Sequence, residues 1–307
     1  MDIQSSLSED LQVSVRAWPN WQSRFVRFSL LIGTHSRRAE LFYCRHSLGF
    51  RIPRSRNTAL ELGSSSFTKF TNADIREQQG LKVYIASSSA TRVADAIDRI
   101  KSSLQPGSPY IKGHTIDLSS DDVEVRLENL LTDITTELHG PLDHIVFTAN
   151  RLNLVPISAL AIEYLRTVPQ VNFHAPLLLA KLVRANPAFL NPSYRSSFTL
   201  TTGAVADRPV RGYEFGSGIA AALVGITRGL ALDMKPIRVN VVSPGATDTE
   251  MWGEGEMREM RRKGATERAF LGKVGTAEEV GEAYLYLMKD SNCTGTCINT
   301  NGGAFLQ

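Results

Sequence analysis

From residue 80 onward, short apolar runs alternate with segments whose apolar residues recur at helical spacing. The run at 81–86 reads LKVYIA, and the segment 90–104 that follows repeats apolar residues every three or four positions. A short apolar run bounded by turn residues predicts a strand, and a period near 3.6 predicts an amphipathic helix. The same alternation continues through strand-like runs at 114–118, 144–148, 197–201 and 237–242 and helical patterns at 123–138, 157–182, 217–232 and 276–287.

Strands that alternate with helices along a chain form a parallel sheet with helices on both faces. We therefore predict an α/β fold, a doubly wound parallel sheet in a single domain, over residues 80–307. Ligands of such sheets bind beyond the carboxyl ends of the strands, where the strand order reverses. Candidate functional residues are expected at that edge.

The first 79 residues lack this regularity. Arginine is frequent there, no lysine precedes Lys69, and neither periodicity persists. An Arg-rich, acid-poor stretch is typical of a transit peptide, but Asp2, Glu9 and Asp10 stand where such a peptide would begin. We predict a divergent, partly irregular region over 1–79, which is either a genuine extension or translated non-coding sequence.

Composition narrows the class of protein. The chain has 307 residues, of which 42% are hydrophobic and 21% charged, which is ordinary for a globular protein and excludes disorder as the main state. Its three cysteines, Cys44, Cys293 and Cys297, are too sparse for a disulfide framework or a metal site, which favours a cytoplasmic protein. A net charge of +3 does not indicate a nucleic-acid partner. The sequence contains no apolar run of about 18 residues or more, so it does not predict a membrane span.

The carboxyl-terminal part carries specific motifs. They are LALD at 230–233, IRVNVVSPG at 237–245, Thr249, TGT at 294–296 and the pair Gly302-Gly303. Together these motifs resemble the short-chain dehydrogenase/reductase family, and the resemblance covers about residues 80–307. It implies a Rossmann-like domain that binds NAD(H) or NADP(H).

The resemblance assigns cofactor-binding positions one at a time. Members that prefer NAD place an Asp or Glu at the tip of the second family strand, whereas this chain has Ser87 and Ser88, followed by Arg92. Hydroxyls and a guanidinium suit a 2′-phosphate, because Arg donates to phosphate oxygens in a fixed fork, so we predict NADP(H). A serine turn that caps the next helix is the simpler alternative, and both can hold. The further positions that the resemblance assigns are Asp117 beside the adenine, Asn150 in a family glycine position, and Pro244, Gly245, Thr247 and Thr249 around the nicotinamide and pyrophosphate.

The glycine-rich turn after the first family strand departs from the expected pattern. The run at 28–34, FSLLIGT, looks like a remnant of that strand and makes Gly33 a cofactor-binding candidate, but the residues after it contain no glycines where the backbone should approach the pyrophosphate. From Gly33 to Lys82 the chain runs 49 positions, whereas a whole βαβ unit needs about 30 residues. Inserted sequence is therefore indicated. Gly63, followed by three serines, is an alternative turn.

The catalytic pattern departs as well. The family reaction uses a Tyr as proton donor, a Lys four residues later that stabilises the phenolate, and a Ser that orients the carbonyl. Counting back from GITR at 225–228 places the Tyr position at Gly216 and the Lys position at Ala220, so both groups are missing. Thr202 keeps a hydroxyl at the Ser position. Asn172 matches the fourth family residue, which helps to hold a proton-relay water; a polar residue inside a helix is the alternative.

Two other residues are candidates for the missing acid. Tyr213 lies three positions before Gly216, in a predicted loop. Asp207 follows the strand that carries Thr202, and its alternative is an exposed turn with Pro209.

Loss of the Tyr and Lys does not remove hydride transfer, because the hydride comes from the cofactor and the protein supplies orientation and electrostatics. An iminium substrate already carries positive charge and accepts hydride without a proton donor. Divergent family members in fungal secondary-metabolite pathways are similar to this chain: a TTG or TSG segment, then Arg-Pro, then a helix without Tyr and Lys. We predict an NADPH-dependent tailoring reductase acting on a small apolar iminium-like or carbonyl substrate. The alternatives are a catalytically inactive binding protein of the same fold and a non-redox cyclase or isomerase.

Two further features concern ligand access and assembly. The segment 250–271 combines methionines, Trp252 and Phe270 with arginines, which predicts either a mobile lid over an apolar ligand or an ordinary amphipathic surface helix. By analogy with the family we expect a homo-oligomer that pairs the helices carrying Asn172 and Ser217.

Overall fold

A computed structural model of the chain describes residues 13–16, 25–30, 39–44, 58–62, 82–103, 110–151 and 153–306. The chain divides into two compact units, Met1–Arg51 and Ile52–Gln307. The first unit contains an antiparallel sheet in the order β1 (Val13–Arg16), β2 (Phe25–Leu30) and β3 (Ala39–Cys44). Strands therefore occur within the region for which the sequence predicted partly irregular structure.

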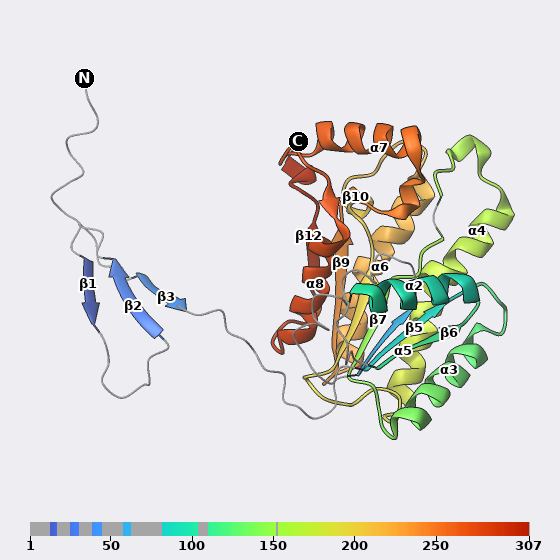
Figure 1. Ribbon diagram of the computed structural model, residues 1–307, viewed down its shortest axis with the longest axis horizontal. Coiled ribbons are helices and arrows are strands. Elements are labelled where there is room, and N and C mark those ends of the chain that lie inside the picture. Colours follow the sequence, from blue (N-terminus) through green and yellow to red (C-terminus); the bar gives the residue numbers. More distant parts are fainter. Residues whose placement is uncertain are drawn as a thin grey trace. The chain divides into compact units, whose positions relative to one another are not determined.

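The second unit is built on a seven-stranded sheet in the order β12-β9-β8-β7-β4-β5-β6, in which every neighbouring pair is parallel (Figure 1). The order reverses at β4, which lies between β5 and β7. This confirms the predicted α/β fold with a doubly wound parallel sheet. The strands are β4 (Thr58–Leu62), β5 (Lys82–Ser87), β6 (Tyr110–Thr115), β7 (His144–Phe147), β8 (Ser197–Thr201), β9 (Arg238–Pro244) and β12 (Cys297–Thr300).

From β5 onward, helices connect the strands of the described part of the chain, and a few short turns lie near the strand ends. The α-helices are α2 (Ala90–Ser103), α3 (Val123–Leu138), α4 (Ile162–Pro169), α5 (Ala175–Ala185), α6 (Glu214–Asp233), α7 (Gly255–Arg268) and α8 (Ala277–Lys289). A π-helical turn, η2 (Gln170–His174), joins α4 to α5, and 3-10 turns form η1 (Ile157–Ala159), η3 (Ala204–Ala206), η4 (Glu250–Trp252) and η5 (Ala304–Leu306). The short strands β10 (Thr247–Asp248) and β11 (Gly275–Thr276) pair in parallel on their own.

The first strand of the parallel sheet is β4, and the prediction that the run at 28–34 supplies it is wrong. β4 pairs with both β5 and β7, whereas β2 pairs antiparallel with β1 and β3 in the other unit. From Thr58 to Ser87 the β4-to-β5 unit has 30 residues, so the excess length disappears. Gly33 lies outside the described residues, and the strand assignment that made it a cofactor candidate no longer holds. Gly63, also outside them, follows β4 directly in the sequence.

The boundary of the Rossmann-like unit moves for the same reason. The sequence placed it at residue 80, where regular periodicity begins, but β4 already belongs to the sheet and the compact unit starts at Ile52. β4 reads TALEL, and its acidic residue, Glu61, interrupts the apolar run that would have marked a buried parallel strand. The pattern was therefore too short and too polar to be recognised.

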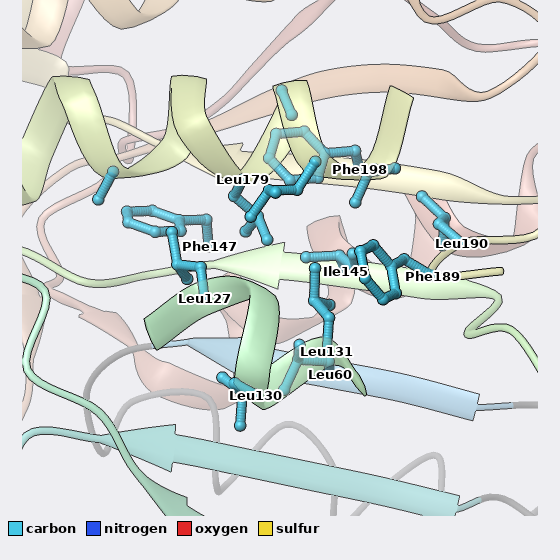
Figure 2. Packing of buried hydrophobic residues seen from close by; sticks show 14 of the residues in the cluster. Leu60, Leu127, Leu130, Leu131, Ile145, Phe147, Leu179, Phe189, Leu190 and Phe198 are labelled. Atoms are coloured by element: carbon cyan, nitrogen blue, oxygen red, sulfur yellow. The ribbon is translucent and has the colours of Figure 1, made fainter. Parts of the chain in front are cut away.

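Helices cover both faces of the sheet, and successive residues of each strand face opposite sides. On one face, α3, α5 and α6 enclose the largest hydrophobic cluster, part of which Figure 2 shows: Leu127 and Leu131 from α3, Ile145 and Phe147 from β7, Leu179 from α5 and Phe198 from β8. On the other face, Val146 and Val242 pack with Val280, Tyr284 and Leu287 of α8, while Val83 and Ile85 pack with Ala96 and Ile100 of α2. The core thus fixes the strand ends at which ligands bind.

Within the described residues, one helix, α6, is long enough and apolar enough to cross a membrane, judged by length and composition alone. Its buried residues, among them Ala220, Leu223 and Thr227, lie on one side of the helix, and Leu223 belongs to the core cluster beside the sheet. We therefore assign α6 to the layer of helices that flanks the sheet.

Candidate active site

The predicted cofactor and catalytic positions gather at one edge of the parallel sheet. All strands of this sheet run in the same direction, so their carboxyl ends meet at one edge, and ligands of such sheets bind where the strand order reverses, here at β4. The positions at or just beyond these ends are Ser87 on β5, Asp117 after β6, Asn150 after β7, Thr202 after β8 and Pro244 on β9.

A hydroxyl–guanidinium pair stands at the end of β5. The Nη2 atom of Arg92 donates to the Ser88 hydroxyl at 2.8 Å, and the main-chain N–H of Arg92 donates to the Ser89 hydroxyl at 3.4 Å. These residues lie at the N-terminus of α2, where free main-chain N–H groups also favour anions. The serine turn thus bonds to the first turn of the helix and also orients Arg92, a geometry that is compatible with both interpretations of this segment. The donor set fits a phosphate group.

Asp117 lies in the turn after β6 as an ionised carboxylate. The hydroxyl and main-chain N–H of Ser119 both donate to its Oδ1 atom, at 2.7 and 2.9 Å, and these bonds lower the pKa of Asp117. An exposed acceptor at this edge is compatible with the predicted position beside an adenine, whose exocyclic amine is a donor.

The structure brings the predicted residues Asn172 and Asn150 together. Asn172 is buried within the π-helical turn η2; its amide Nδ2 donates to Asn150 Oδ1 at 2.8 Å, and its Oδ1 accepts from the main-chain N–H of Arg151 at 3.1 Å. Single π-helical turns inside helices recur at functional sites. Asn172 therefore joins the α4–α5 helix pair to the loop that follows β7.

Thr202 and Ala220, to which the sequence analysis assigned the family Ser and Lys positions, lie in contact. Thr202 Oγ1 donates to the main-chain carbonyl of Ala220 on α6 at 2.7 Å. A hydroxyl has one proton to donate, so with this bond in place Thr202 can accept a hydrogen bond from a ligand but not donate one. Ala220 is 2% exposed and carries no charge.

Tyr213 packs directly on Gly216. A Cβ atom built on Gly216 would lie 2.7 Å from Cε1 and Cζ of the Tyr213 ring, which is too close for a side chain at 216. Tyr213 is the residue that precedes the first turn of α6. Burial, with a smaller effect from Tyr164, raises the pKa of Tyr213 to about 12. The ring therefore fills the space in which a side chain at 216 would begin, and its hydroxyl is neutral near pH 7.

Asp207 and Arg208 lie in an exposed turn after η3. The Arg208 guanidinium donates to the main-chain carbonyl of Ala304, which ties this turn to the carboxyl-terminal residues. Burial, with a smaller effect from Asp207, raises the pKa of the Cys297 thiol. Among the described residues Asp207 forms no hydrogen bond with Thr202 or Tyr213. This placement agrees with the exposed-turn interpretation.

The loop after β9 is held by close packing. A Cβ on Gly245 would lie 2.6 Å from the Asn301 Cα atom, so only glycine fits there. Thr247 Oγ1 donates to the Gly245 carbonyl at 3.1 Å, and Thr247 then enters β10. Thr249 follows, and its carbonyl accepts from the Trp252 N–H at 3.0 Å.

The predicted lid is the segment between the paired strands β10 and β11. It contains α7, whose Arg258 forms an ion pair with Asp248 of β10 at 2.8 Å. Met257 and Met260 of α7 are exposed, as is Phe270 beyond its end. The geometry accommodates both a lid and a surface helix.

Glu61 is a buried acid that the sequence analysis missed. It is 1% exposed; Thr148 Oγ1 donates to its Oε1 at 3.1 Å, and its Oε2 has no partner. Burial raises the pKa of Glu61 well above its usual value. The signal in the sequence was a single carboxylate in an apolar run directly before Gly63.

Glu61 should make stability fall as pH rises. Because its pKa is higher in the folded than in the unfolded chain, the unfolded chain releases the proton first, above about pH 4.3, and the free energy of unfolding then drops by about 1.4 kcal/mol per pH unit until the folded pKa is reached. Glu61→Gln should remove this component, so the stability of the variant relative to the parent should increase between pH 5 and pH 8. Urea unfolding at both pH values measures this, and equal differences at the two would contradict it.

Comparison with known proteins gives consistent results. Residues 54–307 match the family model described as an SDR-like Rossmann domain. The short-chain dehydrogenase/reductase ATR9 of Stachybotrys chlorohalonatus is 42% identical over 251 residues, covering 81% of this chain and 96% of that protein. The short-chain dehydrogenase/reductase fsr5 of Gibberella fujikuroi is 36% identical over 259 residues, covering 81% and 94%. Among solved structures, the MalC Reductase/Diels-Alderase from Malbranchea aurantiaca superposes with a TM-score of 0.74 at 33% identity, covering 83% of this chain and 98% of that one.

Proposed function

Since the chain belongs to the short-chain dehydrogenase/reductase family, we propose that it is an NADPH-dependent reductase that acts on an activated, apolar small molecule in secondary-metabolite biosynthesis. The observation that carries the proposal is the pairing of Thr202 with Ala220 beside Gly216. This is a hydride-transfer site of the family without its proton donor. The relation to MalC, described as a reductase, supports the reaction class.

The residues present fit a phosphorylated dinucleotide. Ser88 and Arg92 would hold the 2′-phosphate of NADPH, and Asp117 would face its adenine. Asn150 and Thr249 would border the rest of the cofactor. A bound nicotinamide cofactor supplies hydride to the substrate. The loop after β4, which faces the pyrophosphate in this fold, lies outside the described residues.

The protein residues favour a substrate that needs no proton. The Thr202 hydroxyl donates its proton in a hydrogen bond to the Ala220 carbonyl, and position 220 carries no ammonium. Tyr213, with a pKa raised to about 12, is a weak acid. A neutral carbonyl becomes an alkoxide when hydride adds and requires a proton. An iminium does not: its carbon gains the hydride, the C=N π pair moves to nitrogen, and the positive charge is neutralised.

Arg92 should determine the choice between the two nicotinamide cofactors. Arg92→Ala should weaken NADPH binding by roughly ten- to a hundredfold and leave NADH binding nearly unchanged, because one charge-assisted bond to phosphate is worth about 1.5–3 kcal/mol. Fluorescence titration with each cofactor measures both constants. Arg99→Ala, on the same helix, is the matched control and should change neither. Equal losses for NADPH and NADH in Arg92→Ala would refute the assignment.

A non-redox cyclisation is the second candidate function, because the related MalC is described as both a reductase and a Diels-Alderase. Such a reaction needs an oriented substrate in an apolar pocket and no hydride. Turnover of substrate without consumption of NADPH would favour it. Failure to bind NADPH at all would favour the third alternative, a binding protein of the same fold.

We also propose that two copies pair through α6 and the α4–α5 helix pair. Leu232 near the end of α6 is 77% exposed although the helix is strongly apolar, and an apolar helix face gains free energy when a second copy covers it. Size-exclusion chromatography with light scattering should give a dimer or tetramer, which Leu232→Glu should weaken.

A further inference from the structure

Three aromatic side chains lie near Gly216: Tyr213 packs on it, Phe215 precedes it in the chain, and Tyr164 contacts Phe215. Tyr164 and Phe215 have ring centroids 5.9 Å apart at an interplanar angle of 63°, which is an edge-on contact. Tyr213 packs on Gly216, and Tyr164 adds, after burial, to the raised pKa of the Tyr213 phenol. All three are half-buried. We call Tyr164, Tyr213 and Phe215 the aromatic group.

The hydroxyl of Tyr164 is held by the main chain. It accepts from the Asn153 N–H at 3.1 Å and donates to the Asn153 carbonyl at 2.9 Å. Its donor is therefore occupied, and Phe215 has none. What the aromatic group offers a ligand is mainly the π-surface of its rings, which attracts cations.

The charges around the aromatic group are mixed, and the change at position 220 removes a positive one. At position 220 an alanine stands where the family has a lysine, so no ammonium faces the ligand. The N-terminus of α6 carries partial positive charge, and Arg211 is an exposed cation before it. Glu214 in the first turn of α6 offsets these; its carboxylate accepts from the Gly212 N–H at 3.2 Å.

We propose that the aromatic group binds the positively charged part of the substrate, which assigns the substrate to the class of iminium or quaternary nitrogen compounds. The inference rests on the proposed function for the location of the substrate. The proposal explains in one way why Gly216 and Ala220 stand where the family has Tyr and Lys. The glycine admits the Tyr213 ring, and the alanine removes a repelling charge.

The test compares a cationic probe with its neutral counterpart. N-methylisoquinolinium and isoquinoline are titrated by calorimetry at pH 8, where isoquinoline is neutral, without cofactor. The parent chain should prefer the cation. Tyr213→Leu should weaken N-methylisoquinolinium binding by roughly three- to thirtyfold, the range of one cation–π contact, and change isoquinoline binding less than about twofold.

Matched variants distinguish the contribution of the Tyr213 ring to binding from that of its hydroxyl. Tyr213→Phe keeps the ring and should retain the binding of the cation, whereas an acid–base role would be lost. Tyr286→Leu, an exposed tyrosine on α8, is the control and should bind both probes as the parent does. Circular dichroism checks that each variant is folded; if Tyr213→Leu is not, Phe215→Leu and Tyr164→Leu provide the same comparison.

Three results would overturn the proposal: no preference of the parent for the cation, equal losses for both probes, or a loss in Tyr213→Phe as large as in Tyr213→Leu. Since no hydride is transferred in these titrations, a failure of the reductase proposal would appear separately, as normal cation binding without NADPH oxidation.

Discussion

Reduction of a neutral ketone by this protein should be slower by about 10²–10⁴-fold than by a relative that has the Tyr and Lys, and reduction of an iminium should show no such deficit. The factor is what a positioned general acid contributes. Here Gly216 and Ala220 supply no acid, and Thr202 has its proton bonded to the Ala220 carbonyl. An iminium is neutralised by the hydride itself, so the missing acid does not slow it.

Restoring the acid requires three changes. A side chain at 216 would meet the ring of Tyr213 at 2.7 Å, so Gly216→Tyr and Ala220→Lys must be combined with Tyr213→Ala. NADPH oxidation followed at 340 nm should then show a gain in kcat for ketones of about 10²-fold or more, with no gain for an iminium, whose binding should weaken when the Tyr213 ring is lost and a lysine stands at 220. The double variant that keeps Tyr213 is the control and should gain less.

Brisk ketone reduction by the unaltered protein would contradict this account of the site. Tyr213→Phe and Asp207→Asn would then identify the source of the proton. If both substrates are inert because cofactor does not bind, the glycine-rich turn must first be restored, and the topology places it directly after Leu62, where β4 ends.

Replacement of Arg238 should destabilise the Rossmann-like unit by about 3–5 kcal/mol. The Arg238 side chain is 3% exposed at the start of β9, and its guanidinium donates to main-chain carbonyls only. Two of these carbonyls, of Leu287 and Met288, end α8, where a cation also interacts favourably with the helix dipole. The acceptors are the carbonyls of Tyr194, Arg195, Leu287, Met288 and Cys293.

Arg238→Met keeps most of the volume but leaves these buried carbonyls without a donor, which is the origin of the expected loss. Urea unfolding followed by circular dichroism measures it. Arg262→Met, on the exposed side of α7, is the matched control and should change stability by no more than about 0.5 kcal/mol. A loss at Arg238 as small as that of the control would show that water replaces the guanidinium.

The sequence by itself determined the layered architecture from β5 onward. Strand-like runs and helical periods are local properties, because the side chains of one element repeat with its own geometry. The motif at 237–245 likewise identified β9 and the loop after it. The family resemblance, not the local pattern, assigned Asp117 and Thr202 as site residues. The structure places both just beyond the ends of β6 and β8, where the carboxyl ends of parallel strands share an edge.

The tertiary structure alone decided which strand comes first and what fills the active site. The strand β4 is identified by its pairing with β5 and β7. Its buried carboxylate, Glu61, interrupts the apolar pattern by which a buried strand is predicted from sequence. The bond between Asn172 and Asn150, and the ring of Tyr213 over Gly216, depend on how elements pack. Such contacts follow from the positions of whole helices and strands in space, for which the local pattern of apolar residues carries no signal.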